Sequence, residues 1–392
     1  MEIHTPVSDA QTIELIRSAY HSNTGLEICG NATKTGLGRR MDTQHRLSLS
    51  KLSGIVLYEP EEMVITVRTG TLLQEIEVAL SERKQCLAFE PADIAPLWNL
   101  PDGAATIGGT IGATICGPRR FSAGAPRDHL LGFIGVNGKG ERFKAGGKVV
   151  KNVTGYDLPK LASGSFGTLF IMTELTLRAV PRAEETICLC VEGLNTTEAL
   201  ATLRQMSASP LDPTALTFLS RDVAQRLNLS ALSQTLIRLE GQSAGVAARA
   251  TDILNALPHP TRTLKGDDAK RLFSKIASVH PMFDAEQGLW RVSVPPTSAD
   301  NVLSHFAPHA FIADWAGGLL WLQLSQAFSA REVHKYVQDQ GGHATWVRQS
   351  PTKDSNDVFP LLDPNLAHLT SRLKDAFDPA RILNPGRMYK DI

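Results

Sequence analysis

ICGNATKTG, residues 28–36, and TIGGTIGA, residues 106–113, are the two stretches of this sequence that decide its fold. Both are rich in small residues, and the first also carries a lysine, Lys34. The N–H groups of such a loop can converge on a diphosphate, because glycine permits tight turns and close approach of the main chain. One such stretch is a weak signal. Two of them in a glycine-rich domain of short strands predict a site for a cofactor that contains a diphosphate.

Residues 101–167 are dense in glycine, with Ile, Val, Thr and Phe between the glycines. Glycine weakens helix interiors, whereas β-branched and aromatic residues favour strands, so we expect turns between short strands in this region. The clearest hairpin lies in residues 132–146, where Asn137-Gly138 suits a tight turn. A strand over residues 167–180 follows.

Before this region the pattern alternates between helices and strands. Apolar residues recur at helical spacing over residues 12–20, and a short apolar strand comes next. Residues 54–70 indicate two strands joined by a turn. A helix follows, for which we expect Thr71 to be the N-cap and Gln74 or Glu75 to close a capping box.

The pattern changes after residue 181. Glycine becomes rarer, and strand, helix, strand, strand and helix follow in that order up to residue 257. The same order returns over residues 289–349 and ends with one more strand. Two such units predict one antiparallel sheet with its helices on a single face, in which the first unit lacks its final strand. An unrelated α+β arrangement is the alternative. A helix over residues 365–377 closes the chain.

The composition indicates a soluble protein of two or three domains. The 392 residues include 40 Lys and Arg against 40 Asp and Glu, so we expect no nucleic-acid partner. The N-terminus lacks a signal-like segment, and the apolar stretches fall short of the roughly 20 residues that span a bilayer, so no direct membrane insertion is expected. Of the five cysteines, Cys188 and Cys190 are interpreted as reduced and buried. We expect a cytoplasmic protein, or one associated with a membrane through partner subunits.

Several familiar motifs are absent or misplaced in the sequence. No glycine stretch has the form of a Rossmann fingerprint or the Gly-Lys-Ser/Thr end of a Walker loop. The segment 164–167 precedes a strand, whereas a hydrolase nucleophile precedes a helix. His305 and His309 are separated by Pro308 and have no nearby carboxylate, so we expect no metal site. The scattered cysteines argue against an iron–sulfur cluster in this chain.

Four segments, taken in order, resemble the FAD-binding domain of the vanillyl-alcohol oxidase, or PCMH-type, flavoproteins. They are ICGNATKTG, YEPEEMVITVRTGTLLQEIEVAL, GGTIGATICGPRRFSAGAPRD and KNVTGYDLPKLASGSFGTLFIMTELTLRAVP. Through LWRVSVPPT and FDPARILNPGRMY the whole chain resembles the FAD-binding second subunits of glycolate oxidase, or glycolate dehydrogenase. The resemblance implies an α+β fold: a PCMH-type domain over residues 1–182, an antiparallel cap domain of ferredoxin-like repeats over 183–350, and a tail, 351–392, that returns to the FAD domain.

The resemblance also implies which residues hold FAD. The first loop would wrap the diphosphate, the second stretch would line the path toward the flavin ring, and the strand through Leu169, Phe170 and Ile171 would offer main-chain contacts. Gly124 is a looser assignment, and Asn384 and Arg387 either approach the flavin or lock the C-terminus. Lys34 either balances diphosphate charge or is a solvated loop lysine. The predicted FAD ligands are Gly30, Asn31, Ala32, Thr33, Lys34, Asp102, Gly103, Thr106, Gly108, Gly109, Gly124, Ile171 and Arg387.

The reaction and the partners follow from the same resemblance. It implies an FAD-dependent oxidoreductase subunit of a multi-subunit glycolate dehydrogenase, which oxidises glycolate, a small 2-hydroxy acid, to glyoxylate. Its partners would be a paralogous FAD-containing hydroxy-acid-oxidising subunit and an iron–sulfur subunit. Many relatives attach FAD through a histidine of the first loop; this loop has none, so we predict non-covalent FAD. The alternatives are a free-standing FAD-dependent 2-hydroxy-acid oxidoreductase and a flavin-free assembly scaffold.

No catalytic residue is assigned from the sequence. The His-Gly-x-Gly-Asn-x-His signature of the related catalytic subunits is missing, so it stays open whether this chain oxidises substrate or only relays electrons. Arg291 and Arg348 are candidate cations for a substrate carboxylate, and His280 and His343 are candidate bases. Each also has an ordinary structural explanation, as a surface ion pair or a hydrogen-bonded histidine.

Overall fold

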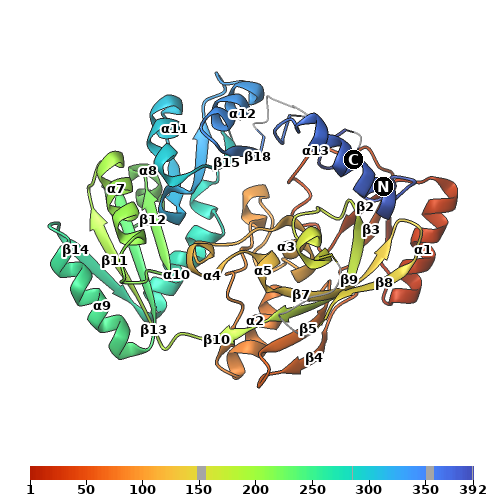
Figure 1. Ribbon diagram of the computed structural model, residues 1–392, viewed down its shortest axis with the longest axis horizontal. Helices are drawn as coiled ribbons and strands as arrows, with labels where there is room; N and C mark the ends of the chain where they lie inside the picture. The colour runs from red at the N-terminus through yellow and green to blue at the C-terminus, as the bar shows by residue number, and fades with distance from the viewer. Residues whose placement is uncertain (148–155, 285, 350–356, 391) are drawn as a thin grey trace. The chain divides into compact units, whose positions relative to one another are not determined.

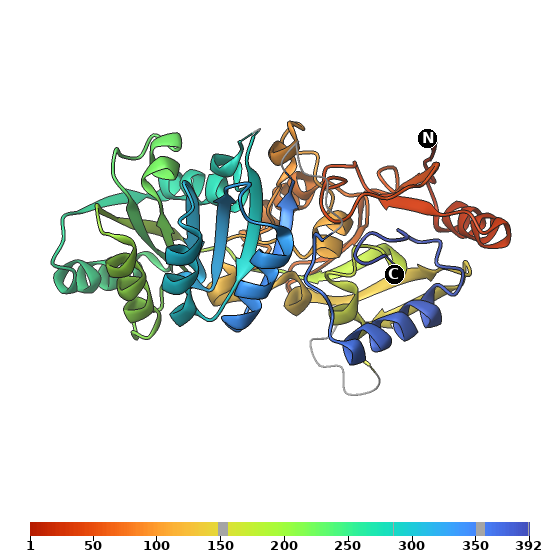
Figure 2. The same cartoon turned by 90° about the horizontal axis from the view of Figure 1, so that it is seen from above.

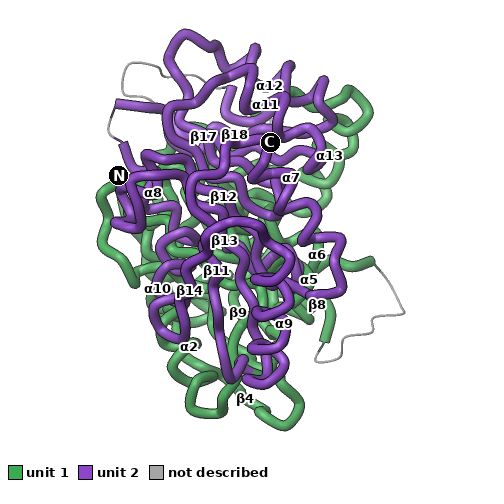
Figure 3. The backbone as a smooth tube through the Cα atoms, turned by 90° about the vertical axis from the view of Figure 1, so that its left-hand side faces the viewer, with its two compact units in different colours: residues 1–116, 125–181, 361–392 green, residues 117–124, 182–360 purple. Residues whose placement is uncertain are grey.

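The computed structural model describes residues 1–147, 156–284, 286–349, 357–390 and 392. The chain divides into two compact units, shown in different colours in Figure 3. Unit 1 comprises residues 1–116, 125–181 and 361–392, and unit 2 comprises residues 117–124 and 182–360. The segment 117–124 therefore groups with unit 2, although its neighbours on both sides in the sequence belong to unit 1.

The described residues of unit 1 form three sheets, with strands labelled in Figure 1. A parallel sheet has the strand order β1-β3-β2, an antiparallel sheet has the order β4-β5-β9-β7-β8, and β10 pairs with β6. The strands are β1 Glu2–His4, β2 Leu26–Cys29, β3 His45–Ser48, β4 Ile55–Glu59, β5 Val64–Arg68, β6 Gln85–Cys86, β7 Leu130–Asn137, β8 Arg142–Gly146, β9 Phe170–Arg178 and β10 Val180–Pro181.

The helices of unit 1 lie against these sheets. Figure 2 shows the C-terminal helix, in blue, running along the five-stranded sheet, and its Phe377 contacts Phe143 of β8 and Phe170 of β9. Ile16 and Ala19 of the first helix pack in one buried cluster with residues of β2 and β3. The helices are α1 Asp9–Ser22, α2 Leu73–Glu82, η1 Ala95–Trp98, α3 Ile107–Ala113, α5 Pro126–His129, α6 Leu158–Ala162 and α13 Pro364–Phe377.

One part of the glycine-rich region is a helix, so the prediction of turns between short strands is wrong there. Helix α3 runs through Ile107–Ala113, and the Thr106 side chain caps it by accepting a hydrogen bond from the Gly109 N–H at 3.4 Å. Ile107 and Ile111 are fully buried. This burial offsets the roughly 1 kcal/mol by which each glycine disfavours a helix.

Two local predictions are wrong by a few residues: the N-cap of α2 and the turn of the β7–β8 hairpin. The N-cap of α2 is Leu72, not Thr71, whose hydroxyl instead donates to the Arg68 and Gly54 carbonyls. The predicted hairpin is present as β7 and β8, but its turn is longer than Asn137-Gly138. The Asn137 N–H donates to the Glu141 carbonyl, and the positive φ falls on Gly140.

Unit 2 is built on one antiparallel eight-stranded sheet, with the order β14-β11-β13-β12-β16-β17-β15-β18. The two predicted repeats are confirmed: each half has the strand order 4-1-3-2, and β12 joins the halves by pairing with β16. The prediction that the first repeat lacks its final strand is wrong, because β14 supplies it. The strands are β11 Glu185–Glu192, β12 Ala215–Leu219, β13 Gln234–Gly241, β14 Thr261–Lys265, β15 Gly288–Ser293, β16 Phe311–Asp314, β17 Leu319–Leu324 and β18 His343–Arg348.

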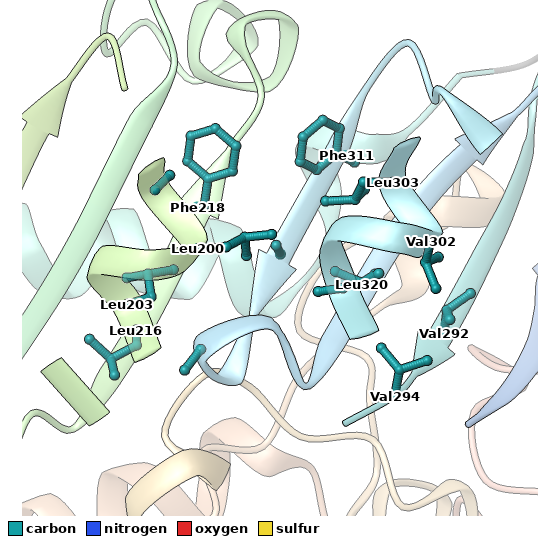
Figure 4. Close-up of a cluster of buried hydrophobic side chains, with 14 of the residues drawn as sticks. Leu200, Leu203, Leu216, Phe218, Val292, Val294, Val302, Leu303, Phe311 and Leu320 are labelled. Carbon is teal, nitrogen blue, oxygen red and sulfur yellow. The ribbon is translucent and has the colours of Figure 1, made fainter. Parts of the chain in front are cut away.

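One face of this sheet carries the main apolar core of unit 2. Helices α7, α9, α11 and α12 all contribute buried side chains to it, and Figure 4 shows those of α7 and α11 against the strands. Alternation along β13 sends Ile237 and Leu239 into this core and Arg238 to the other face, where Phe273 of α10 stacks on its guanidinium. The prediction that all helices lie on one face of the sheet is therefore wrong. The helices of unit 2 are α4 Arg120–Ala123, α7 Thr196–Ser207, α8 Arg221–Arg226, α9 Ser243–Ala256, α10 Gly266–Ala277, η2 His280–Met282, η3 Pro296–Ser298, α11 Ala299–Phe306, η4 Trp315–Gly317 and α12 Ala330–Asp339.

A buried ionic network holds the segment 117–124 to the sheet of unit 2. Glu240 of β13 accepts two hydrogen bonds from Arg119, at 2.7 and 3.1 Å, and lies 3.2 Å from the Arg238 guanidinium. Burial alone would raise the pKa of Glu240, but Arg238 and Arg119 outweigh it and hold the pKa at about 2. The carboxylate is therefore ionised at neutral pH, and the segment is anchored by charge-assisted bonds.

Candidate functional site

A cavity opens within unit 1 where five parts of the chain meet. They are the end of β2, the loop that follows it, helix α3, the start of β9 and the C-terminal tail. The wall combines glycines and apolar side chains with two cations, Lys34 and Arg387.

The cavity brings together most of the predicted FAD ligands. Ten of them line it: Gly30, Asn31, Ala32, Thr33, Lys34, Thr106, Gly108, Gly109, Ile171 and Arg387. Asp102 and Gly103 are exposed and are not among the lining residues, and Gly124 belongs to unit 2. Glu27, Cys29, Thr69, Phe166 and Met172 line it without having been predicted, because nothing in their local sequence distinguishes them from ordinary strand and loop residues.

The loop after β2 is held by hydrogen bonds within itself and to neighbouring segments. Ser48 of β3 donates to the Gly30 carbonyl at 2.9 Å, and Asn31 donates to the Ala104 carbonyl at 3.0 Å. The Thr35 hydroxyl donates to the carbonyl of Ala32, which has a left-handed φ of 57°. The left-handed φ of this turn thus falls on an alanine and not, as the sequence predicts, on a glycine.

The glycines of the site have two different roles. A side chain at Gly30 would place its Cβ 2.2 Å from the Thr106 hydroxyl, and one at Gly108 would place it 1.8 Å from the Thr69 hydroxyl. These two glycines therefore let neighbouring segments pack closely. A Cβ at Gly109 would meet only the Thr106 hydroxyl, at 3.3 Å, and one at Gly112 would meet nothing within 4 Å. The latter pair leaves open space at the cavity wall.

The C-terminal tail locks the first loop from behind. The Asn384 side chain accepts from the Ile28 N–H at 2.7 Å and donates to the Phe166 carbonyl at 2.6 Å. Arg387 donates to the Lys34 carbonyl at 2.8 Å. Both tail residues also line the cavity, so an approach to the flavin stays a prediction for them.

Comparison with known proteins shows the family of this chain. Residues 3–146 match the family model described as an FAD binding domain. The chain is 31% identical over 383 residues to the glycolate oxidase subunit GlcE of Escherichia coli (strain K12), and the alignment covers 97% of both proteins. The chain belongs to the GlcE family. Its cofactor is FAD, as predicted, and the PCMH-type fold class is confirmed.

Two further proteins resemble this chain, one in the sequence of about half of the chain and one in its fold. The glycolate oxidase subunit GlcD of Bacillus subtilis (strain 168) is 29% identical over 198 residues, which are 50% of this chain and 39% of that protein. The 4-ethylphenol oxidase from Gulosibacter chungangensis superposes with a TM-score of 0.74 at 14% identity, covering 99% of this chain and 89% of the other. At that identity the second likeness concerns the fold alone.

The cavity residues of this GlcE-family chain fit FAD. Gly109 and Gly112 leave room at the wall, and Lys34 and Arg387 supply positive charge for a diphosphate. Burial lowers the pKa of Lys34 to about 8, an effect that nearby Asp93 opposes. Burial likewise lowers the pKa of Arg387, to about 10, so both side chains carry their charge at neutral pH.

We expect the affinity for FAD to fall as the pH rises through about 8. The lowered pKa of Lys34 means that the flavin-free protein loses this positive charge above pH 8, whereas the bound diphosphate favours the protonated form. Lys34→Met should bind FAD roughly 10–150-fold more weakly at pH 7, in line with the 1.5–3 kcal/mol of a hydrogen bond to a charged group, and should show no step near pH 8. Titration of flavin fluorescence from pH 6 to pH 9.5 measures both effects.

The control for this prediction is Lys51→Met, which removes an exposed lysine of the same unit. It should keep the affinity and the pH profile of the unaltered protein. An unchanged step near pH 8 in Lys34→Met would show that another group governs the titration.

Of the four candidate catalytic residues, Arg291 and His343 lie near each other. Arg348 is a structural brace, since its guanidinium donates to the Asp284 and Gln287 carbonyls and lies over the Phe283 ring. His280 begins a short 3-10 helix and is exposed. Arg291 and His343 stand on one face of the unit 2 sheet, in neighbouring strands.

Arg291 belongs to a cluster of cations and tryptophans in unit 2. The guanidinium groups of Arg120 and Arg291 lie 4.7 and 5.4 Å from the Trp315 ring, and Arg291 is 6.0 Å from Trp321. Partial burial lowers the pKa of His343, and both arginines lower it further. The histidine is therefore neutral near pH 7 and the cluster carries the charge of its arginines.

The two histidines considered as metal ligands have different surroundings. The His305 ring stacks on Tyr336, with 3.7 Å between ring centroids, and His309 is exposed in the following loop.

Among the described residues, no helix is long and apolar enough to cross a bilayer.

Proposed function

We propose that this chain is the FAD-carrying subunit of a hetero-oligomeric glycolate dehydrogenase, which oxidises glycolate to glyoxylate. The observation that carries the proposal is the end-to-end match with GlcE, over 97% of both proteins, together with a cavity that fits the cofactor. The relative GlcD is also named as a glycolate oxidase subunit and aligns only with half of this chain. This supports two distinct flavoprotein subunits in one enzyme.

The oxidation removes two electrons and two protons from the hydroxyl-bearing carbon and its hydroxyl. Bound FAD supplies an acceptor for a hydride, which is the chemistry that the protein side chains lack. The chain's own residues would bind and orient the cofactor. The loop of residues 30–35 would enclose the diphosphate and Lys34 and Arg387 would neutralise it, while Arg387 holds this loop and Asn384 holds the end of β2 to the tail.

We propose that FAD is held without a covalent bond. Within the described part of the chain, the cavity wall includes no histidine. It does include one thiol, Cys29, but burial raises the pKa of Cys29 to about 11 and keeps it protonated, so it is a poor nucleophile. Acid precipitation should therefore release all of the flavin into the supernatant.

Electrons must leave the flavin for an acceptor outside this chain. All five cysteines are described, and Cys188 and Cys190 form a buried pair with 3.7 Å between their sulfur atoms, while the others lie elsewhere in the fold. An iron–sulfur cluster needs about four thiolates at one place. We therefore propose that a partner subunit with an iron–sulfur cluster receives the electrons, and that a GlcD-like subunit binds the hydroxy acid.

The test compares the purified chain alone with the chain coexpressed with its GlcD-like and iron–sulfur partners. We expect the chain alone to be yellow, to release its flavin on acid precipitation and to reduce a dye only slowly with glycolate. The three-subunit complex should turn over rapidly. Rapid turnover by the chain alone would replace the subunit proposal by a free-standing oxidoreductase, and a colourless protein after incubation with FAD would identify an assembly scaffold.

A further inference from the structure

Three potential metal ligands meet at one edge of the parallel sheet in unit 1. Glu2 and His4 are two residues apart on β1, so their side chains share a face of that strand. His45 is the first residue of β3 and pairs with Glu2 in parallel register. The two strands therefore bring the carboxylate and both imidazoles together, although 41 residues separate the histidines in the sequence.

The distances between these three groups match those in a tetrahedral metal site. His4 Nε2 lies 3.3 Å from His45 Nδ1, Glu2 Oε1 lies 3.7 Å from His4 Nε2, and Glu2 Oε2 lies 3.5 Å from His45 Nδ1. Bonds of 2.0–2.2 Å to zinc, at tetrahedral angles, separate neighbouring ligand atoms by about 3.3–3.6 Å. His4 Nε2 and His45 Nδ1 share a hydrogen bond at this distance, and an ion that replaced its proton would reach all three groups once the two rings turned toward it.

The surroundings leave the three groups accessible to an ion. The planes of the two imidazole rings are 11° apart, and about a quarter to a third of each histidine side chain is exposed. Arg46, the residue after His45, is directed to Glu27, 2.8 Å away, and does not compete for Glu2. The exposed Glu2 leaves solvent access for a fourth ligand.

We propose that Glu2, His4 and His45 form a binding site for one divalent ion of the zinc class. Two imidazole nitrogens and one carboxylate oxygen suit Zn²⁺, Co²⁺ or Ni²⁺ and not Mg²⁺ or Ca²⁺, which prefer oxygen ligands. The fourth position is open to water. The site is separate from the FAD cavity and does not depend on the proposed redox function.

Binding at this site would join β1 to β3. Strand β3 also pairs with β2, and β2 leads directly into the loop that lines the FAD cavity. A metal bridge would therefore stabilise the sheet that carries this loop. An ion that binds the folded chain and not the unfolded chain raises the melting temperature in proportion to the logarithm of its concentration.

The experiment uses the full chain with its FAD and without any histidine tag. After EDTA treatment and dialysis, Zn²⁺ is titrated by calorimetry, and bound zinc is counted after gel filtration. We expect one zinc ion per chain and a higher melting temperature. Loss of an outer partner alone weakens metal sites 10–100-fold, so loss of a ligand in His4→Gln or His45→Gln should weaken binding at least about 100-fold.

The matched control is His368→Gln, which removes an exposed histidine on α13 of the same unit. It should bind zinc like the unaltered chain. Equal flavin content in all variants would show that each has folded. The proposal is overturned if the unaltered chain takes up no zinc, or if His4→Gln and His45→Gln bind it as tightly as the control does.

Discussion

Gly109→Trp is expected to give a folded protein that has lost its yellow colour. A Cβ at this position meets only the Thr106 hydroxyl, at 3.3 Å, so a side chain there needs that hydroxyl to shift by a few tenths of an ångström, and an indole would extend into the cavity. FAD would have to share that space with the indole. We expect affinity to fall at least about 100-fold, which corresponds to about 2.7 kcal/mol. The ratio of flavin absorbance to protein absorbance, before and after incubation with excess FAD, measures the loss.

Two variants separate blocking of the cavity from damage to the fold. Gly109→Ala adds only the Cβ and should keep its FAD. Gly245→Trp introduces the same large side chain at an exposed position of helix α9 in unit 2, where no atom lies within 4 Å of the added Cβ, and should also stay yellow. Stoichiometric flavin in Gly109→Trp would mean that the cofactor does not occupy the cavity beside α3.

Asp378→Ala is expected to destabilise unit 1 by about 3–5 kcal/mol, the usual result of removing one partner from a buried ion pair. Asp378 and Lys374 are fully buried, with 2.8 Å between Lys374 Nζ and Asp378 Oδ2. The ammonium also donates to the Thr168 and Leu383 carbonyls, at 2.6 and 2.8 Å. Burial lowers the pKa of Lys374, and Asp378 opposes that effect.

The same carboxylate holds the start of the tail. It accepts from the N–H groups of Ile382 and Leu383, at 3.2 and 2.8 Å, immediately before Asn384. Asp378→Ala should therefore release the tail and weaken FAD binding as well. Hydrogen exchange followed by mass spectrometry, read on peptides of unit 1, measures the local loss of stability, and flavin titration measures the loss of affinity.

An exposed pair with the same spacing is the control. Lys335 and Asp339 on α12 also lie four residues apart, 2.9 Å from each other, with side chains 77% and 57% exposed. Asp339→Ala should change stability by less than about 0.5 kcal/mol. If Asp378→Ala does not fold, Lys374→Met combined with Asp378→Leu should recover expression, because no charge then stays buried alone. If Asp378→Ala lowers the stability as little as Asp339→Ala does, the buried ion pair does not stabilise unit 1 as proposed.

Regular elements of the fold were predictable because their signals are local. The alternation of apolar residues marks the strands of unit 2 and the spacing of apolar residues marks its helices, so the two repeats follow from the sequence. Strand β14 and helix α10 were missed, although Ala269, Leu272, Phe273 and Ile276 of α10 have helical spacing and are buried. The error at α3 has the opposite cause: burial of Ile107 and Ile111 outweighs the low helix propensity of its glycines.

The fold class, the family and the two glycine-rich stretches that line the cavity follow from the sequence alone, because these depend on residue types at fixed spacing along the chain. The part that each residue plays at the site depends on tertiary contacts. Gly30 and Gly108 serve close packing, Asn384 and Arg387 lock the loop, and Asp102 and Gly103 lie away from the cavity. Contacts between residues hundreds of positions apart depend on how the sheets pack, and local propensities carry no information about that packing.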